Sequence, residues 1–266
     1  MEAVVTILGA RGSVPVSGSE FSRYGGATTC VLVRFGTEYV VLDAGTGLLA
    51  LPDEALAQSA LPLLLTHAHA DHLLGLPLCR YAMKKDARLD IYAAARGGLD
   101  ARAQVCRLLS PPLWPVGPEQ LPADIRFHDL PERFALGAVT VRTMEGNHPG
   151  GVSLLRLEAE GRSVVFATDC TLTGELLPRL ADFARDCDLL LCDGQYHDDE
   201  WSGRSTFGHS SWGYVARFAR SCGVRRLRII HHDPFRTDGE LDRAAQGLRA
   251  EGADYDFAKE RECIRL

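Results

Sequence analysis

The sequence predicts an α/β protein in which helices cover β-sheets. Two observations lead to this prediction: short runs rich in β-branched and aromatic residues are bounded by glycine, and stretches with helical character separate them in the second half of the chain. The predicted helices cover 174–187, 210–222 and 239–251, and Ser210 or Ser211 is expected to cap the second. The predicted strands cover 4–8, 30–35, 39–42, 61–65, 89–93, 124–130, 139–145, 152–158, 163–167, 189–192 and 225–230.

Two segments have a distinct local character. The run Leu61-Pro62-Leu63-Leu64-Leu65 is apolar throughout, which predicts a strand buried on both faces. Residues 111–118 contain four prolines in eight positions, so this stretch must be an irregular loop. Trp114 in the loop is expected to pack the loop against the body of the protein, and stacking on a nucleobase is the alternative.

Length and charge limit the classes of function. The chain has 266 residues and a formal net charge of −6. No linker or repeat divides it, so we expect a single domain over residues 1–266. The negative charge argues against a protein that coats nucleic acid. It does not argue against a small phosphate-bearing substrate, because a metal site adds positive charge locally.

The sequence also predicts the cellular compartment. The N-terminus lacks a positively charged start, and no apolar run approaches the roughly 20 residues needed to span a bilayer. The eight cysteines are scattered, without a Cys-x-x-Cys pair, which indicates reduced thiols. We therefore expect a cytoplasmic protein without membrane contact.

Distinctive polar residues follow several predicted strands. The run His67-Ala-His69-Ala-Asp71-His72 follows the buried strand at 61–65. Further polar residues follow three other strands, and they are His148, Asp169, His231 and His232. Loops from separate strands that each present imidazole or carboxylate predict a metal site at one edge of a sheet.

The spacing and type of these residues favour two hard or borderline cations. His67 and His69 project to one side of an extended segment, because alternate residues share a face. Asp71 and His72 come one turn later, where a helix is expected to begin, and can face a second ion. Imidazole and carboxylate ligands without cysteine suit Zn²⁺, which we expect, or Mn²⁺ or Fe²⁺. A lone loop histidine is usually only solvated, but three clustered imidazoles have little structural purpose without a metal.

This ordered set resembles the metallo-β-lactamase superfamily over essentially the whole chain. The resemblance implies a four-layer αββα sandwich with two metal ions at one edge. It places His67, His69 and His148 on the first metal, and Asp71, His72 and a late histidine on the second, with Asp169 bridging both. The late histidine is His231 or His232, and placement at the strand end favours His231.

Three segments look more like the phosphodiesterase branch of that superfamily, which includes tRNA 3′-processing endonucleases and cyclic phosphodiesterases. They are 8–15 (LGARGSVP), 190–196 (LLCDGQY) and 208–211 (GHSS). The sequence departs from that branch in having Asp193 where glutamate is usual. It also lacks the glycine- and lysine-rich insertion that the tRNA enzymes use to grip their substrate.

These features predict a hydrolase with a water nucleophile activated by two metals, acting on a small phosphodiester such as a cyclic nucleotide. Asp71 is expected to orient the nucleophile, and His209, held by Asp193, to act as general acid. The alternative for this pair is structural: His209 bonded locally and Asp193 supporting a ligand. Asp43 is expected to support a ligating histidine.

Other functions and partners stay open. A hydrolase of a carboxylic ester, lactone or thioester is the first alternative, and a non-enzymatic metal-binding module the second. We expect a small-molecule phosphodiester substrate and no stable nucleic-acid partner, and a homodimer is compatible with the sequence. Arg225, Arg226 and Arg228 are expected on a solvated face rather than in a phosphate clamp.

Overall fold

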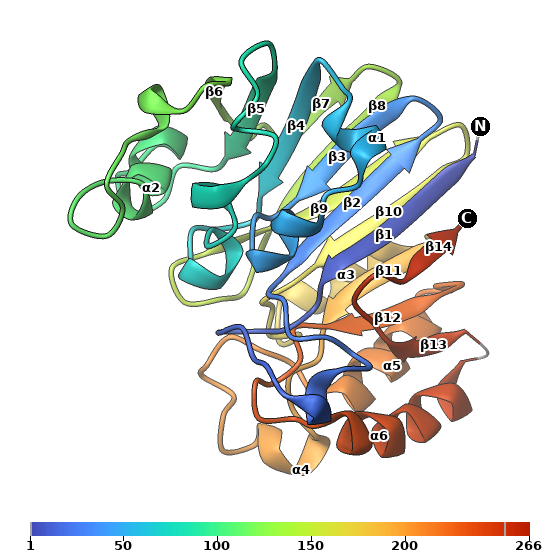
Figure 1. Ribbon diagram of the computed structural model, residues 1–266. Coiled ribbons are helices and arrows are strands. Elements are labelled where there is room, and N and C mark those ends of the chain that lie inside the picture. Colours follow the sequence, from blue (N-terminus) through green and yellow to red (C-terminus); the bar gives the residue numbers. More distant parts are fainter. Residues whose placement is uncertain (1, 253) are drawn as a thin grey trace.

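Two seven-stranded mixed β-sheets lie face to face in the computed structural model, which describes residues 2–252 and 254–266 (Figure 1). The first sheet has the order β14-β1-β2-β3-β4-β5-β6, and the second has the order β13-β12-β11-β10-β9-β8-β7. The strands of the first sheet are β1 (Ala3–Gly9), β2 (Cys30–Phe35), β3 (Glu38–Leu42), β4 (Ala60–Leu65), β5 (Arg88–Ala93), β6 (Asp124–Asp129) and β14 (Cys263–Arg265). Those of the second are β7 (Arg133–Leu136), β8 (Val139–Gly146), β9 (Val152–Ala159), β10 (Arg162–Ala167), β11 (Leu189–Asp193), β12 (Leu227–Ile230) and β13 (Tyr255–Phe257).

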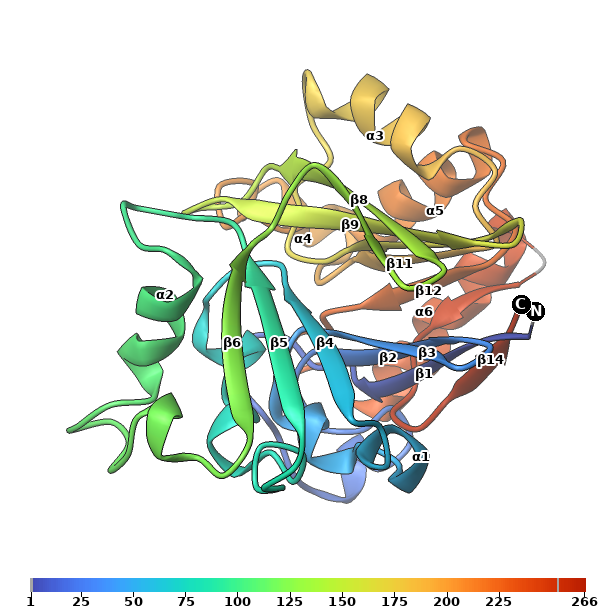
Figure 2. The ribbon, with the colours of Figure 1, turned by 90° about the horizontal axis from the view of Figure 1, so that it is seen from above.

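Helices cover the outer faces of both sheets, as Figure 2 shows from above. The α-helices are α1 (Asp53–Leu56), α2 (Ala101–Leu108), α3 (Leu176–Ala184), α4 (Asp198–Trp201), α5 (Trp212–Ser221) and α6 (Asp238–Glu251). Helices α3, α5 and α6 share one core cluster with the second sheet, and α2 shares another with the first. A third cluster fills the space between the sheets. The four-layer αββα architecture expected from the sequence is therefore confirmed.

The alternation of side chains along a strand explains why the central strands are apolar throughout. In β10, Val164 and Phe166 point into the core between the sheets, whereas Val165 and Ala167 point toward the outer helices. In β4, Leu64 faces the core between the sheets and Leu63 faces the outer cluster. The prediction that this strand is buried on both faces is confirmed.

Several predicted boundaries need correction. The helix expected at 174–187 covers only Leu176–Ala184, since Arg185 leaves the helical conformation and Asp186 has a φ of 51°. The helix expected at 210–222 begins at Trp212. Ser211 is its N-cap residue, but neither serine caps it through the side chain, and the Ser210 hydroxyl instead bonds the chain at Cys170 and Leu172.

Of the three arginines near β12, only Arg228 differs from expectation, because the side chains of Arg225 and Arg226 are 64% and 36% exposed. The strand begins at Leu227 rather than at 225, and Arg228 is buried. Arg228 pairs with Asp254 and Glu262, so it lies in an ion-pair network and not on a solvated face. Arg225 pairs with Asp188, and Arg226 with Asp254.

The proline-rich stretch is irregular through residue 117, and a short 3₁₀ helix, Pro118–Gln120, follows. Trp114 is half-buried and packs against the outer core of the first sheet, in agreement with the packing role. Within residues 2–252 and 254–266, no helix has both the length and the apolar character needed to cross a bilayer.

The strand directions bring the loops of interest to one edge. Strand β4 lies parallel to β3 and β5, and β10, β11 and β12 are mutually parallel. Strand β8 runs in the same direction as β10, because each is antiparallel to β9. The polar residues singled out in the sequence follow these strands. Within each sheet, the carboxyl ends of these strands therefore lie at one common edge.

Candidate metal centre

The seven side chains expected to bind metal lie together at this edge, in two groups. In each group, one possible ligand atom per residue lies within 4.8 Å of the others. The first group comprises His67, His69, His148 and Asp169, and the second comprises Asp71, His72, Asp169 and His231. Asp169 belongs to both groups, which is the position a bridging ligand requires.

The first group draws its residues from both sheets. His67 Nε2 lies 3.6 Å from Asp169 Oδ2, and His148 Nε2 lies 3.2 Å from His69 Nδ1. His148 Nδ1 lies 3.0 Å from the Gly208 carbonyl oxygen, so that the ring N–H donates there and leaves Nε2 facing the centre. His67 Nε2 is buried and has no hydrogen-bond partner among the described residues. A buried imidazole nitrogen without a partner fits a metal ligand.

The second group is organised around two carboxylates. His72 Nε2 lies 3.3 Å from Asp71 Oδ2 and 3.3 Å from Asp169 Oδ1. His231 Nε2 lies 3.2 Å and 3.3 Å from the Oδ2 atoms of Asp71 and Asp169. Asp71 and His72 lie in a single 3₁₀ turn, Ala70–His72, and not at the start of an α-helix as expected, because the backbone leaves the helical conformation at Leu73.

Asp43 supports His72, as the sequence indicated for a ligating histidine. His72 Nδ1 lies 2.7 Å from Asp43 Oδ2, at which distance the ring N–H donates to the carboxylate. Asp43 is fully buried and also accepts hydrogen bonds from the backbone and the hydroxyl of Thr66. This arrangement fixes the ring and turns Nε2 toward Asp71 and Asp169.

The protonation preferences of the residues suit cation binding. Burial lowers the pKa of His67, His69 and His148, so these rings are neutral and offer lone pairs. Burial opposes protonation of His231 as well, but attraction to Asp169, Asp71 and Asp193 outweighs it and raises the pKa to about 9.

His72 behaves like His231. Burial alone would lower the pKa of His72, but attraction to Asp169, Asp43 and Asp71 outweighs this effect and raises the pKa well above its ordinary value. The carboxylates resist protonation in turn: burial alone would raise the pKa of Asp169, but His231, His72 and His67 together hold it well below the usual range. The carboxylates of the second group therefore stay ionised and attract positive charge beside them.

The structure distinguishes the two late histidines. His231 faces the centre, whereas His232 Nε2 lies 2.8 Å from the Ala258 carbonyl oxygen. The His232 ring packs edge-on against Tyr24 and Phe257, and burial lowers its pKa to about 3. His231 is thus the late histidine of the candidate site, as strand-end placement favoured.

Three residues of the site have a backbone conformation that is uncommon outside glycine. Asp43, Asp169 and His231 have φ values of 57°, 48° and 60°. Asp43 and His231 directly follow β3 and β12, and Asp169 lies two residues after the end of β10. Such conformations concentrate at functional sites, where the surrounding structure holds them.

The turn after β1 contacts the second group, which sequence reasoning did not foresee. The Ser13 backbone N–H donates to Asp71 Oδ2 at 2.8 Å. A Cβ atom at Gly12 would lie 2.4 Å from His231 Nδ1, so the glycine lets the chain pass directly beside this ring. Arg11 is fully buried and donates to the carbonyl oxygens of Asp233 and Arg236, which holds the segment after His231. The only sign of these contacts in the sequence was Gly12, the glycine in the turn after β1.

His209 and Asp193 lie beside the second group, as expected. His209 Nδ1 lies 2.7 Å from Asp193 Oδ2, and its ring stacks on that of His231 with 4.7 Å between centroids. Asp193 also accepts hydrogen bonds from the backbone N–H groups of Cys170 and Gln195. Asp193, His209 and His231 together form a third grouping with metal-ligand spacing. The carboxylate of Asp193 is already engaged by these three donors, so a supporting role for it is the better fit.

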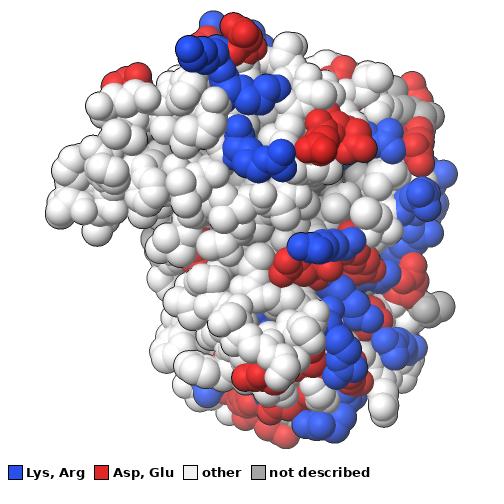
Figure 3. All heavy atoms as spheres, in the orientation of Figure 1, with Lys and Arg blue, Asp and Glu red and all other residues white. Residues whose placement is uncertain are grey.

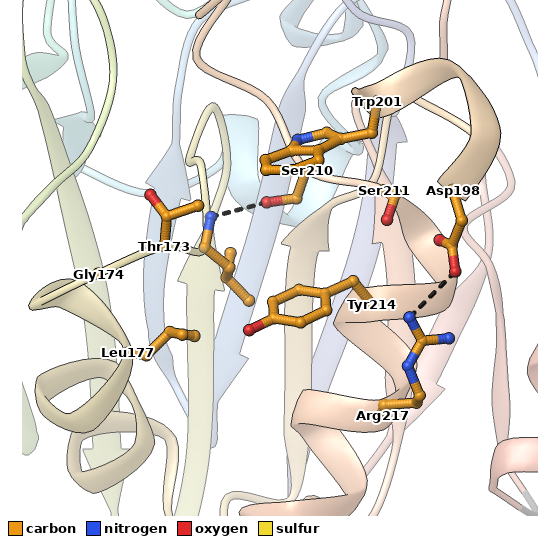
Figure 4. A pocket seen from close by; sticks show the side chains of 10 residues that line it. Thr173, Gly174, Leu177, Asp198, Trp201, Ser210, Ser211, Tyr214 and Arg217 are labelled. Atoms are coloured by element: carbon orange, nitrogen blue, oxygen red, sulfur yellow. Dashed lines mark hydrogen bonds and ion pairs between the residues drawn. The ribbon is translucent and has the colours of Figure 1, made fainter. Parts of the chain in front are cut away.

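A pocket of about 360 Å³ lies next to Ser210, between α4, α5 and the start of α3 (Figure 4). Trp201 and Tyr214 contribute aromatic walls, and Arg217 pairs with Asp198 at one end. None of the candidate ligands lines this pocket. It is therefore distinct from the place where the two groups could hold cations.

Comparison with known proteins supports the class of protein that the fold and the two residue groups indicate. Residues 38–232 match the family described as "Beta-lactamase superfamily domain", and the chain belongs to this superfamily. The Mycobacterium tuberculosis protein Rv1339 is 28% identical over 234 residues, which cover 87% of this chain and 81% of that protein. A protein named Ribonuclease Z from Streptomyces coelicolor is 26% identical over 291 aligned positions, covering 94% of this chain and 92% of its own. The metallo-β-lactamase fold protein YhfI from Bacillus subtilis has a similar structure, with a TM-score of 0.74 at 18% identity and full coverage of both chains.

Replacing Gly12 tests whether the turn after β1 positions the second group. We expect Gly12→Ala to displace the His231 ring, because the added Cβ would meet it at 2.4 Å. Binding of a divalent ion at the second group should weaken by roughly 10- to 100-fold, the range typical of changes next to metal ligands. Metal titration followed by elemental analysis measures this. Gly247→Ala in α6 is the matched control, because an added Cβ there would meet no described atom within 4 Å apart from the neighbouring backbone of its own helix. Unchanged affinity for both ions in Gly12→Ala would show that the close approach has no bearing on metal binding.

Proposed function

We propose that this protein is a phosphodiesterase that uses two divalent metal ions to hydrolyse a small phosphodiester, such as a cyclic nucleotide. The observation that carries the proposal is the pair of four-residue groups that share Asp169, with the His209–Asp193 pair stacked against the second. Membership in the beta-lactamase superfamily supports a hydrolytic reaction. Relatives named Ribonuclease Z support a phosphodiester as the bond that is cleaved, because that is the bond a ribonuclease breaks.

The residues divide between two ions. His67, His69 and His148 would hold the first, and Asp71, His72 and His231 the second, with Asp169 on both. Nitrogen and oxygen ligands without sulfur suit Zn²⁺, and they also accept Mn²⁺ or Fe²⁺. When bound, such ions make a water molecule more acidic and neutralise charge on phosphate oxygens.

The chain itself would supply orientation and proton transfer. Asp71 is fixed by the Ser13 amide and would orient the attacking water. His209 would protonate the departing alkoxide oxygen. Asp193 would hold the imidazole in place through Nδ1. Such a general acid typically contributes 10²- to 10⁴-fold in rate.

A combined metal analysis and substrate panel tests the proposal. One preparation is assayed with bis(p-nitrophenyl) phosphate, cyclic nucleotides, a lactone and a thioester, before and after chelation. We expect two divalent ions per chain and turnover of phosphodiesters that is lost with the metal. Turnover of the carbonyl substrates alone would replace the proposal with an esterase, lactonase or thioesterase. Bound metal with no turnover of any substrate would favour a non-enzymatic metal-binding role.

The role of His209 predicts a dependence on the leaving group. We expect His209→Ala to slow hydrolysis of a cyclic nucleotide by 10²- to 10⁴-fold, because its leaving group is an alkoxide that needs a proton. Hydrolysis of bis(p-nitrophenyl) phosphate should fall much less, since p-nitrophenolate departs without protonation. Asp193→Asn should show the same trend with a smaller loss. Steady-state kinetics at verified full metal content measures both. An equal loss on the two substrates would assign His209 a structural role instead.

A further inference from the structure

Charged side chains are sparse on the side of the molecule toward which the carboxyl ends of the central strands point. Figure 3, in the orientation of Figure 1, shows Lys, Arg, Asp and Glu gathered on the right-hand side and toward the upper and lower edges, and the left-hand face is largely uncharged. Charged groups that contact the loops of this edge can therefore be considered one by one. One of them joins the two sheets: Arg96, in the loop after β5, pairs with Glu145 in β8.

The guanidinium of Arg96 binds both strands that carry the turn of His148. Nη1 and Nη2 donate to the two carboxylate oxygens of Glu145 at 2.7 Å and 3.0 Å, and Nη2 also donates to Ser153 Oγ at 2.9 Å. Glu145 and Ser153 are direct partners in the ladder between β8 and β9, one pair before the turn 147–151. The Arg96 side chain is only 13% exposed. A planar guanidinium that binds a carboxylate through two parallel hydrogen bonds fixes geometry as well as charge.

The loop after β5 presents Arg96 in a defined position. The backbone groups of Arg96 and Leu99 exchange two hydrogen bonds of 2.9 Å across the glycine pair 97–98, whose φ values of 56° and 77° permit this tight turn. Gln104 in α2 is buried, and its Nε2 atom donates to two carbonyl oxygens of the same loop at 2.8 Å and 3.0 Å. The guanidinium is therefore anchored to the first sheet and its outer helix.

Ser153 connects this contact to the other side of the first group of candidate ligands. Its backbone N–H donates to the Thr66 carbonyl oxygen at 2.9 Å, and Thr66 directly precedes His67. The rings of His67 and His148 lie 5.0 Å apart, measured between centroids. The relative position of the two rings thus depends on where the β8–β9 ladder lies against the first sheet, which is the position that Arg96 fixes.

The turn itself packs directly on the ion pair. A Cβ atom at Gly151 would overlap Arg96 Nη1 and would lie 2.7 Å from Glu145 Oε1. The Gly151 backbone N–H in turn donates to the His148 carbonyl oxygen at 2.9 Å. The residue that carries the imidazole is therefore separated from the guanidinium by a single glycine.

We infer that Arg96 is a positioning residue for the first group: it joins the two sheets so that His148 and His67 can share a cation. The inference rests on the proposed function for the assignment of these histidines as metal ligands. Arg96 does not contact the cation and acts through the turn of His148. The second group has supports of its own, the Ser13 amide and Asp43, so it should not depend on Arg96.

Zinc titrations of proteins in which only one group keeps all its ligands test the inference. His231→Ala leaves the first group complete, and in this background we expect Arg96→Gln to weaken Zn²⁺ binding by roughly tenfold or more, as removal of a support for a metal ligand does. His67→Ala leaves the second group complete, and there Arg96→Gln should leave the Zn²⁺ affinity unchanged. An equal loss in both backgrounds, or no loss in either, would overturn the inference.

Arg156→Gln is the matched control. Arg156 lies in β9, as Ser153 does, its side chain is 11% exposed, and its Nε atom lies 2.8 Å from Glu158 Oε1. We expect its loss to lower the thermal midpoint of unfolding without changing the Zn²⁺ affinity of the first group. Arg96→Lys keeps the charge but not the two parallel hydrogen bonds, so it should restore only part of the affinity. A loss in Arg156→Gln as large as that in Arg96→Gln would mean general destabilisation and would overturn the inference.

A double-mutant cycle in the otherwise wild-type protein keeps the test decisive if the single-group proteins do not fold. Arg96→Gln, His148→Ala and the combined variant are dialysed against a chelator, and the zinc that each retains is measured. Because Arg96 acts through His148, the combined variant should retain as much zinc as His148→Ala alone. Glu145→Ala, at a side chain that is 56% exposed, breaks the same pair and should reproduce the effect of Arg96→Gln. Additive losses in the combined variant would contradict the positioning role.

The zinc measurements separate this inference from the proposed function. If no phosphodiester is hydrolysed but Arg96→Gln weakens zinc binding at the first group alone, the proposed function fails and the positioning role stands. If phosphodiesters are hydrolysed and Arg96→Gln changes zinc binding at neither group, the positioning role fails and the proposed function stands.

Discussion

The carboxylate of Asp169 connects side chains that the two sheets deliver from opposite sides of the core. Its oxygens lie 3.3–3.8 Å from nitrogen atoms of His67 and His72, which follow β4, and of His148 and His231, which follow β8 and β12. Asp169 can do this because its backbone turns sharply where β10 ends, with a φ of 48°. A buried charge of this kind is unfavourable unless opposite charge surrounds it. The convergence of four imidazoles on one carboxylate is therefore both a structural requirement of the edge and the reason that it can hold cations.

The same device supports the centre from each sheet. Asp43 follows β3 in the first sheet and Asp193 ends β11 in the second, and both are fully buried. Each holds the Nδ1 atom of a histidine at 2.7 Å, His72 in one case and His209 in the other. Fixing Nδ1 determines the tautomer and directs Nε2. The two pairs differ in what lies beyond: His72 contacts both carboxylates of the second group, whereas His209 stacks on the His231 ring. Equivalent support thus produces a candidate metal ligand on one side and a candidate proton donor on the other.

Most of this arrangement could be predicted from the sequence. The central strands are buried on both faces, so polar residues at their ends are easily distinguished from the apolar runs. Strand periodicity cannot show strands of three residues, such as β13 and β14, which depend on pairing with distant segments. Placement at the strand end favoured His231, but the sequence did not show which group engages His232. That group is the Ala258 carbonyl oxygen, which β13 brings beside the chain. The contact of the Ser13 amide with Asp71 could not be predicted either, because the donor is a backbone N–H and does not depend on which residue stands at position 13. Ser210 shows the reverse case, since a residue typical of a helix cap instead binds the neighbouring loop.

The charge distribution gives the site and its surroundings separate tasks. Cations held by the two groups would place positive charge deep at the strand ends, where carboxylates and neutral imidazoles meet. The chain then needs no free arginine at the entrance to attract one phosphate. A formal net charge of −6 would repel a long polyanion but only weakly oppose a diester with a single charge.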